Sequence, residues 1–146
     1  INPSSKKILW KLHDKLFHQH DVDIINNEEI AIFNNNRIYT DRDKAYKNNE
    51  INVYNFTTNQ LSSPYDKVLN ENKVRTVNQG LMEITEHGVF VEEQNSGRYI
   101  FFEKNGEVVF DYINKAENSS DVYQVHWSRL ITNKEKMDIL RSKFYD

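Results

Sequence analysis

Two histidines and a carboxylate stand close together near the start of the sequence, at His18, His20 and Asp21. An imidazole titrates near neutral pH, so it can carry a proton or donate a hydrogen bond to an anion. Residues i and i+2 of a strand share a face, which places both imidazoles together and turns Asp21 the other way. These residues therefore indicate a site at the mouth of a strand. Because Asp21 would point away, we expect no metal there, and no cofactor is expected.

The residues that follow the histidines predict a β-hairpin. Residues 22–25 begin an alternating strand, a polar turn follows, and residues 29–33 form a second, apolar strand. A similar hairpin recurs about sixty residues later, over residues 79–91, but it has no histidine at the position of His20. A repeated scaffold with one unrepeated chemical group is typical of a repeat protein that carries its function at one site.

Alternation of period two continues through most of the chain, and short polar turns interrupt it. It predicts strands at residues 7–12, 22–25, 29–33, 50–56, 80–84, 89–93, 98–103, 108–112 and 122–127. The clearest hairpin turn is Asn105-Gly106, which tolerates the positive backbone angles of a tight turn. Four-stranded units of ~45 residues are typical of β-propeller blades. We therefore predict an all-β fold of antiparallel propeller blades, about two and a half of them over residues 1–131.

The remaining segments predict loops and one helix. Residues 34–49 are polar and charged and are expected on a rim outside the sheet, and residues 57–72 link the two fuller units. The order Thr132-Asn133-Lys134-Glu135 resembles a capping box. It predicts a short C-terminal α-helix over residues 134–143, within residues 132–146, that packs on a sheet edge and covers it.

Composition narrows the class of protein. The 146 residues suffice for one ordinary domain, and a 12% aromatic content favours sheets. The 19 basic and 22 acidic side chains are well mixed, which argues against a nucleic-acid partner. The sequence contains no cysteine and no apolar run of the roughly 18 residues that span a membrane.

The start of the sequence suggests a fragment. It begins at Ile1 without a methionine and soon enters the apolar run Ile8-Leu9-Trp10. Two and a half blades would also leave sheet edges open. We therefore expect the remaining blades of a longer chain, or a partner subunit, to cover those edges.

Several motifs together resemble the arylsulfotransferase-like propeller family. They are Trp10, Gln19-His20-Asp21, Ile32-Phe33-Asn34-Asn35, the strand at residues 51–56, Gln79-Gly80, Gly97-Arg98, Asn105 to Tyr112 and Val122-Tyr123. Their order covers residues 8 to about 130. The resemblance implies a six-bladed propeller in which histidines and an arginine of the central channel carry a sulfuryl group from one phenol to another. It also favours a periplasmic or secreted location.

The resemblance assigns roles to single residues. His20 matches the family histidine of the Gln-His strand start and is the candidate catalytic residue. His18, Arg37 and Arg42 are candidates for binding an aryl sulfate or another small anion. A sulfate-binding imidazole must present an N–H to its ligand, so the ring of His20 should face an open space rather than a backbone carbonyl.

Two departures from the family pattern keep an alternative open. Asn49-Glu50 stands where competent members carry Ser-Arg, and a carboxylate there would repel sulfate. Asn78-Gln79-Gly80-Leu81 has no nucleophilic histidine. The alternative is a non-catalytic binding or structural module that uses its rim loops. In that case His20 is a hydrogen-bonded structural group. Under either interpretation, His126-Trp127 is assigned to the packing of a final strand.

Overall fold

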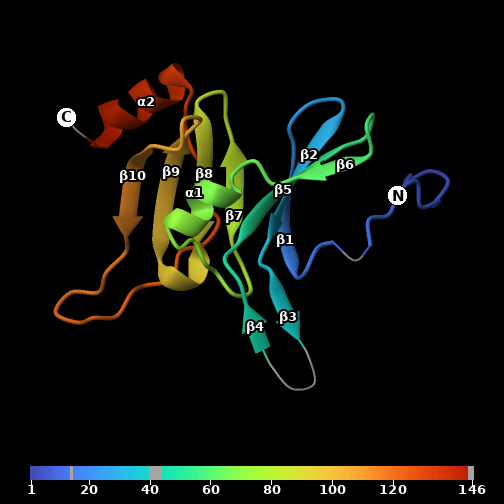
Figure 1. Ribbon diagram of the computed structural model, residues 1–146. Coiled ribbons are helices and arrows are strands. Elements are labelled where there is room, and N and C mark those ends of the chain that lie inside the picture. The colour runs from blue at the N-terminus through green and yellow to red at the C-terminus, as the bar shows by residue number, and fades with distance from the viewer. Residues whose placement is uncertain (14, 40–43, 145–146) are drawn as a thin grey trace.

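The computed structural model describes residues 1–13, 15–39 and 44–144 (Figure 1). The first sheet contains β1 (Gln19–Ile24), β2 (Glu29–Asn34), β5 (Glu50–Asn55) and β6 (Gln60–Ser62), in that spatial order. The second contains β7 (Leu81–Ile84), β8 (Gly88–Glu93), β9 (Arg98–Glu103) and β10 (Val108–Ile113), in the order β10-β9-β8-β7. All pairings are antiparallel.

The core lies between the two sheets. Apolar side chains at alternate positions of each sheet face the other sheet and are almost fully buried: Ala31, Phe33, Ile51, Met82, Val89, Val91, Ile100 and Phe102. The short helix α1 (Asp66–Glu71) adds Leu69, and Val74 follows it. Burial of these faces supplies the main free energy that holds the sheets together.

The repeated hairpins take equivalent positions, as predicted. β1–β2 and β7–β8 are the first two strands of their sheets, and β1 lies beside β7. The prediction of an all-β chain with antiparallel sheets and a short C-terminal helix is confirmed. Two four-stranded sheets with neighbouring first strands are consistent with adjacent propeller blades. The number of blades in the whole molecule stays a prediction.

Two predicted strands are wrong. Residues 7–12 form no strand, and the ring of Trp10 lies 4.7 Å from that of Tyr54 and 5.3 Å from that of Phe56. Residues 122–127 form only an isolated bridge between Lys115 and Val122. Alternation marks which side chains are apolar, but a strand also requires a neighbour for its backbone hydrogen bonds.

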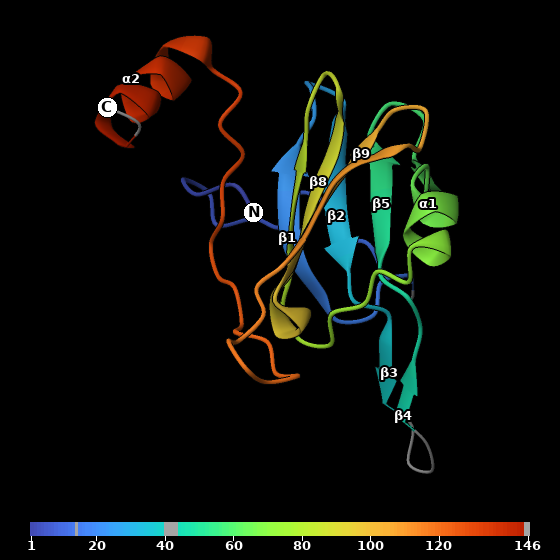
Figure 2. The same cartoon turned by 90° about the vertical axis from the view of Figure 1, so that its left-hand side faces the viewer.

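The two predicted loops contain regular structure. Residues 34–49 include the ribbon of β3 (Arg37–Tyr39) and β4 (Lys44–Tyr46), which projects away from both sheets (Figures 1 and 2). Residues 57–72 include β6 and α1. The β3–β4 ribbon lies outside both sheets, as expected, but the prediction is wrong for the ends of the segment: Asn34 belongs to β2, and Asn34, Asn35, Asn36 and Asn49 are buried. Residues 40–43 lie outside the described residues.

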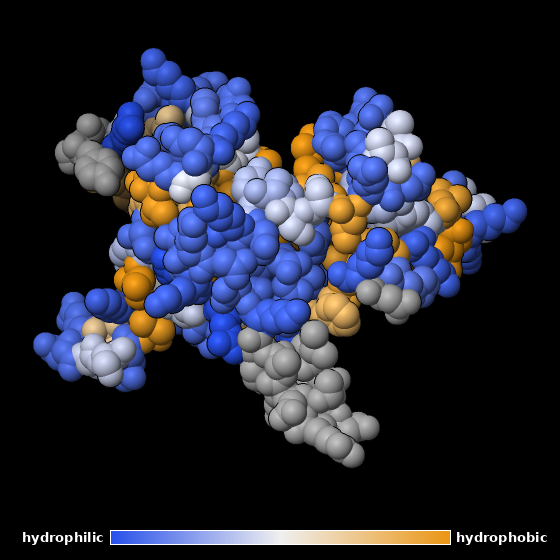
Figure 3. All heavy atoms as spheres, viewed as in Figure 1, coloured by the Kyte–Doolittle hydropathy of each residue, from blue (hydrophilic) through white to orange (hydrophobic). Residues whose placement is uncertain are grey.

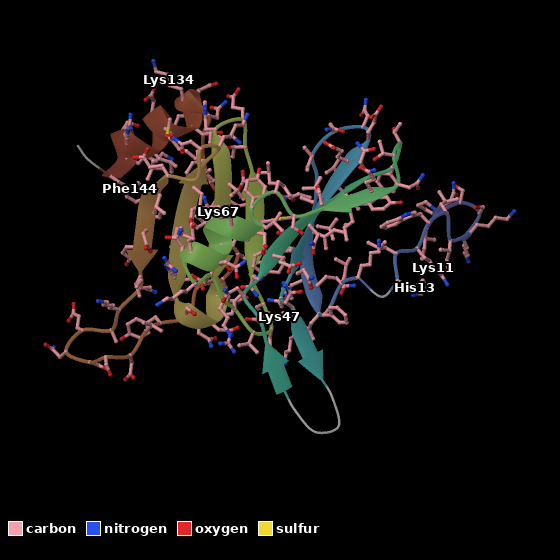
Figure 4. All side chains as sticks on the ribbon, in the orientation of Figure 1. Lys11, His13, Lys47, Lys67, Lys134 and Phe144 are labelled. Carbon is pink, nitrogen blue, oxygen red and sulfur yellow. The ribbon has the colours of Figure 1, made fainter. Side chains whose placement is uncertain are left out.

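The C-terminal helix α2 (Lys134–Phe144) exists, but it does not cover a sheet edge. It buries no residue and stands apart from the sheets (Figure 2). Its cap is Asn133 rather than Thr132, since the amide of Lys136 donates to Asn133 Oδ1 at 2.9 Å. Figure 4 shows Phe144 at the far end of this helix, where its side chain is exposed.

The surface is mostly hydrophilic, with apolar patches between the polar groups (Figure 3). The outer strand β10 contributes several of them, because all six of its residues are exposed. Phe110 and Tyr112 are 49% and 48% exposed. The described residues contain α1, α2 and the short 3-10 helix Gln94–Ser96, and none of these is long and apolar enough to cross a membrane.

Candidate functional site between β1 and β7

A cleft of about 200 Å³ lies where β1 meets β7. Its walls come from both repeated hairpins and from a later segment of the chain: His20 and Asp21, then Gln79, Gly80 and Leu81, then Glu92 and Gln94, and finally His126 and Trp127. It brings two imidazoles, two carboxylates and an indole together. The cleft is the place where the structure could support chemistry.

A β-bulge positions His20. Gln19 pairs with Asn34 and Asp21 pairs with Phe33, so His20 is the extra residue of β1. A bulge interrupts alternation and redirects side chains. As a result His20 and Asp21 both reach β7, and the prediction that Asp21 points away from the imidazole is wrong.

The imidazole of His20 contacts the backbone of the other hairpin. Its Nδ1 lies 3.1 Å from the carbonyl oxygen of Gly80, which can only accept, so Nδ1 carries the proton. The expectation that the ring avoids backbone carbonyls is therefore wrong for Nδ1. The side chain is exposed, and within the described part of the chain Nε2 has no hydrogen-bond partner.

Gly80 is required for this contact. Its φ of +136° lies in a region that side chains rarely adopt, and a Cβ would lie 2.5 Å from Cε1 of Phe33. Phe33 belongs to the buried core between the sheets. The absence of a side chain thus lets the chain before β7 approach β2 closely.

The carboxylate of Asp21 adds a second contact between β1 and β7. We call the line along which these two strands meet the seam. Its Oδ1 accepts from the amide of Val22 at 3.0 Å, and its Oδ2 accepts from the amide of Met82 at 3.0 Å. The contact to Met82 crosses from one sheet to the other. His20 and Asp21 therefore join β1 to β7 through bonds between side chains and backbone.

Residues 125–130 lie across the second sheet and close the cleft. Glu92 is 1% exposed, and its Oε2 accepts from both the amide (2.8 Å) and the hydroxyl of Ser128. The amide of Leu130 donates to Glu83 Oε2 at 3.0 Å. These bonds hold His126 and Trp127 at the cleft, so their assignment to a final strand is wrong. Alternation carried no signal for this placement.

The other candidate residues do not join His20. His18 precedes β1 with a φ of +65°, so it does not share a strand face with His20. Arg37 begins β3 and donates from Nη1 to Oδ1 of Asn78. Neither lines this cleft. Arg42 lies outside the described residues.

Asn49 has a structural role, and Glu50 lies away from the cleft. Asn49 is fully buried, and its Nδ2 donates to the carbonyl of Thr76 at 2.9 Å while its Oδ1 accepts from the amide of Thr76 at 2.6 Å. Asn35 is also buried and donates to the carbonyls of Thr76 and Gln79, at 3.0 and 2.8 Å. These amides fasten the segment that leads to Gly80, a role that the sequence analysis missed. Glu50 does not line the cleft.

Arg98 is used in a similar structural way. It donates two bonds of 2.8 Å to Asp111 and one of 2.9 Å to the buried Glu93. The bonds from Arg98 hold the pKa of Asp111 below its usual range. This ion-pair network ties β8, β9 and β10 together on the core side.

The groove that continues along the seam is acidic. Asp21, Asp23, Glu83 and Arg129 line it. Burial, and then the charges of Asp21 and Glu83, raise the pKa of Asp23, while Arg129 opposes this shift. Among the described residues, no group of three or more histidine or acidic side chains is arranged to hold a metal ion.

Comparison with known proteins gives one result. No curated protein and no solved structure matches the chain. A family model does match, over residues 1–115, and its description is arylsulfotransferase (ASST). That match includes both sheets, the hairpin that carries His20 and the glycine that accepts its hydrogen bond, and the chain therefore belongs to the arylsulfotransferase family.

Proposed function

We propose that the cleft transfers sulfuryl groups between phenolic compounds and that His20 is its catalytic residue. The observation that carries this proposal is the hydrogen bond from His20 Nδ1 to the Gly80 carbonyl. Because that bond fixes the proton on Nδ1, the lone pair of the neutral ring lies on Nε2. An oriented imidazole with a lone pair is a suitable nucleophile.

The transfer takes place in two displacements at sulfur. Nε2 of His20 attacks the sulfur of an aryl sulfate, an N–S bond forms, and the aryl O–S bond breaks with both electrons going to the departing phenolate. A second phenol then attacks the sulfur, the N–S bond breaks, and the phenol loses its proton. His126, the other imidazole of the cleft, supplies a proton to the first phenolate and accepts one from the second phenol.

The cleft contains acidic side chains, which oppose the binding of an anionic substrate, as well as groups that offset their charge. Asp21 and Glu92 carry negative charge, but both accept bonds from main-chain N–H groups, which offset that charge. Arg129 lies along the adjoining groove, which shares Asp21 with the cleft. Its guanidinium places one positive charge on the groove beside the cleft.

The test is turnover with 4-nitrophenyl sulfate as donor and phenol as acceptor. His20→Asn should lower turnover by about a hundredfold or more, the usual scale for a positioned acid, base or nucleophile. The thermal midpoint should stay nearly unchanged. His87→Asn is the control, since His87 lies in the turn of the equivalent hairpin and is exposed. Equal turnover in the two variants would contradict the proposal.

A second function is favoured by the same hydrogen bonds. His20 and Asp21 both bind the backbone around β7, which a non-catalytic binding or structural module would also require. In that case His20→Asn lowers the thermal midpoint and leaves turnover per folded molecule unaltered. Measuring both quantities on one preparation separates the two functions.

We also infer that the exposed face of β10 is covered in the complete assembly, by further blades or by a partner subunit. Its apolar side chains support this inference. Phe110→Lys should weaken that association, and light scattering of the parent and the variant would measure it. An unchanged mass at every concentration would count against a partner subunit at this face.

A further inference from the structure

We propose that Trp127 is the specificity-determining residue of the cleft, where its indole stacks against the aromatic ring of the ligand. The inference rests on the proposed function, because it names the part of the substrate that this residue recognises. It concerns residues 125–130, which lie beyond the stretch that matches the family model. We call them the strap.

The strap is fastened at both ends of the cleft. Before Trp127, the amide of Val125 donates to the carbonyl of Gln94 at 3.4 Å, and Val125 is 5% exposed. After Trp127, Ser128 bonds to the buried Glu92. Anchors on either side fix the backbone that carries the indole, so a ligand meets a positioned group.

The backbone at Trp127 is strained, and the strain does not serve to bury the side chain. Its φ is +56°, which is uncommon for a bulky residue, yet the residue is 79% exposed. A large indole held in an unfavourable conformation at the mouth of a cleft is typical of a functional position. Core packing cannot account for this placement.

A cation covers one face of the indole, while the residue as a whole is 79% exposed. The guanidinium of Arg129 lies over the ring, with its Cζ 5.9 Å from the centroid. The cation–π contact restrains the ring plane. A ligand ring can then stack on the opposite face, and Leu81 offers an apolar wall in the same cleft.

The dimensions indicate the class of ligand. At about 200 Å³ the cleft is smaller than the roughly 300–1,000 Å³ of a typical drug-sized pocket. It has room for a compound with one aromatic ring. The polar groups of His20 and Gln79 lie on the same cleft and would face a hydroxyl or sulfate substituent.

The chain makes a direct test available, because it has only two tryptophans. Trp10 packs on Tyr54 and Phe56, away from the cleft, so Trp10→Phe leaves Trp127 as the sole indole emitter. The probes are 4-nitrophenol and 4-nitrophenyl sulfate, since a nitrophenyl ring that stacks on an indole quenches its fluorescence. We expect saturable quenching by both. Quenching that rises linearly without saturation would overturn the proposal.

Calorimetric titration with 4-nitrophenol then compares variants at Trp127. Trp127→Ala should bind about tenfold more weakly, and Trp127→Phe should bind as the parent does. Equal affinity in Trp127→Ala would overturn the proposal. If Trp127→Ala fails to fold, the fluorescence titration decides alone.

His20→Asn distinguishes the two failures. If the cleft binds nitrophenol in the parent and in His20→Asn but neither protein transfers sulfuryl groups, the proposed function fails while the role of Trp127 stands. If turnover depends on His20 but nitrophenol affinity does not depend on Trp127, the role of Trp127 fails while the proposed function stands.

Discussion

The hairpin of β1 and β2 and the hairpin of β7 and β8 have the same place in their sheets but different chemistry. Where the first has His20 and Asp21, the second has Gly80 and Leu81. These positions also meet, because His20 bonds to the carbonyl of Gly80 and Asp21 bonds to the amide of Met82. One copy supplies the side chains and the other supplies the backbone, so the difference between the copies is what joins them.

The two hairpins also differ in the length of their turns. Ile24 pairs with Ile30, six positions further on, whereas Ile84 pairs with Val89, five positions further on. Gly88 follows this shorter turn and lets β9 approach β8 closely, since a Cβ there would lie 1.9 Å from the carbonyl oxygen of Phe102. The two hairpins therefore repeat each other in position and in strand pairing, but their side chains differ.

The largest expected effect comes from giving the second hairpin a side chain at the seam. Gly80→Ala should lower the free energy of unfolding by about 2 to 4 kcal/mol, because it adds backbone strain and forces a Cβ against Phe33. Urea unfolding measures the loss. The matched control is Gly106→Ala, where φ is also positive but the nearest atom lies 4.0 Å away. Equal losses would show that close approach at the seam is unimportant.

The next effect comes from removing the acceptor on the first hairpin. Asp21→Ala should cost about 1–3 kcal/mol, because the amide of Met82, a residue that is 1% exposed, loses its partner. Asp21→Asn keeps an acceptor oxygen and should cost less. Chemical denaturation of both variants checks this order, and a reversed order would contradict the proposed seam.

The smallest effect depends on pH. The folded state raises the pKa of Asp23 above its ordinary value of 3.8, so the ionised carboxylate opposes folding at neutral pH. Asp23→Asn should therefore raise the thermal midpoint at pH 7. The gain should shrink as the pH falls through the raised pKa towards 3.8, where the parent becomes protonated.

The control for this experiment is Glu117→Gln, a change at an exposed acidic residue away from the seam. Its thermal midpoint should follow that of the parent at each pH. A gain for Asp23→Asn that persists at low pH would assign the effect to packing rather than to charge.

The predictions from sequence succeeded where local pattern determines structure. Strands β2, β5, β8 and β9 are rich in apolar side chains that the fold buries, and all six residues of β8 are buried. Gly106 marks the turn between β9 and β10. The pattern at residues 7–12 misled because pairing depends on a distant neighbour. The bulge at His20 was invisible for the same reason, since two residues of β1 oppose one residue of a partner strand.

The candidate site could be predicted only in part. His20 was identified as a candidate and lies on the cleft, whereas Asp21 lies there too although it was expected to point away. His126 and Trp127 come from a segment without regular structure, whose place depends on Ser128 and Glu92 meeting across the fold. A single sequence contains no local signal for such a contact. The sequence pattern likewise did not reveal that Arg37 would pair with Asn78.

The order of strands within each sheet has a consequence for folding. Each sheet is built from strands that follow one another along the chain, with only the β3–β4 ribbon inserted, so most of its pairings are local. Local pairings close short loops and form fast. We expect each sheet to assemble on its own timescale and the docking of one sheet on the other to come later. His20, Asp21 and Gly80 would then belong to the late step, and substitutions there would speed unfolding more than they slow folding.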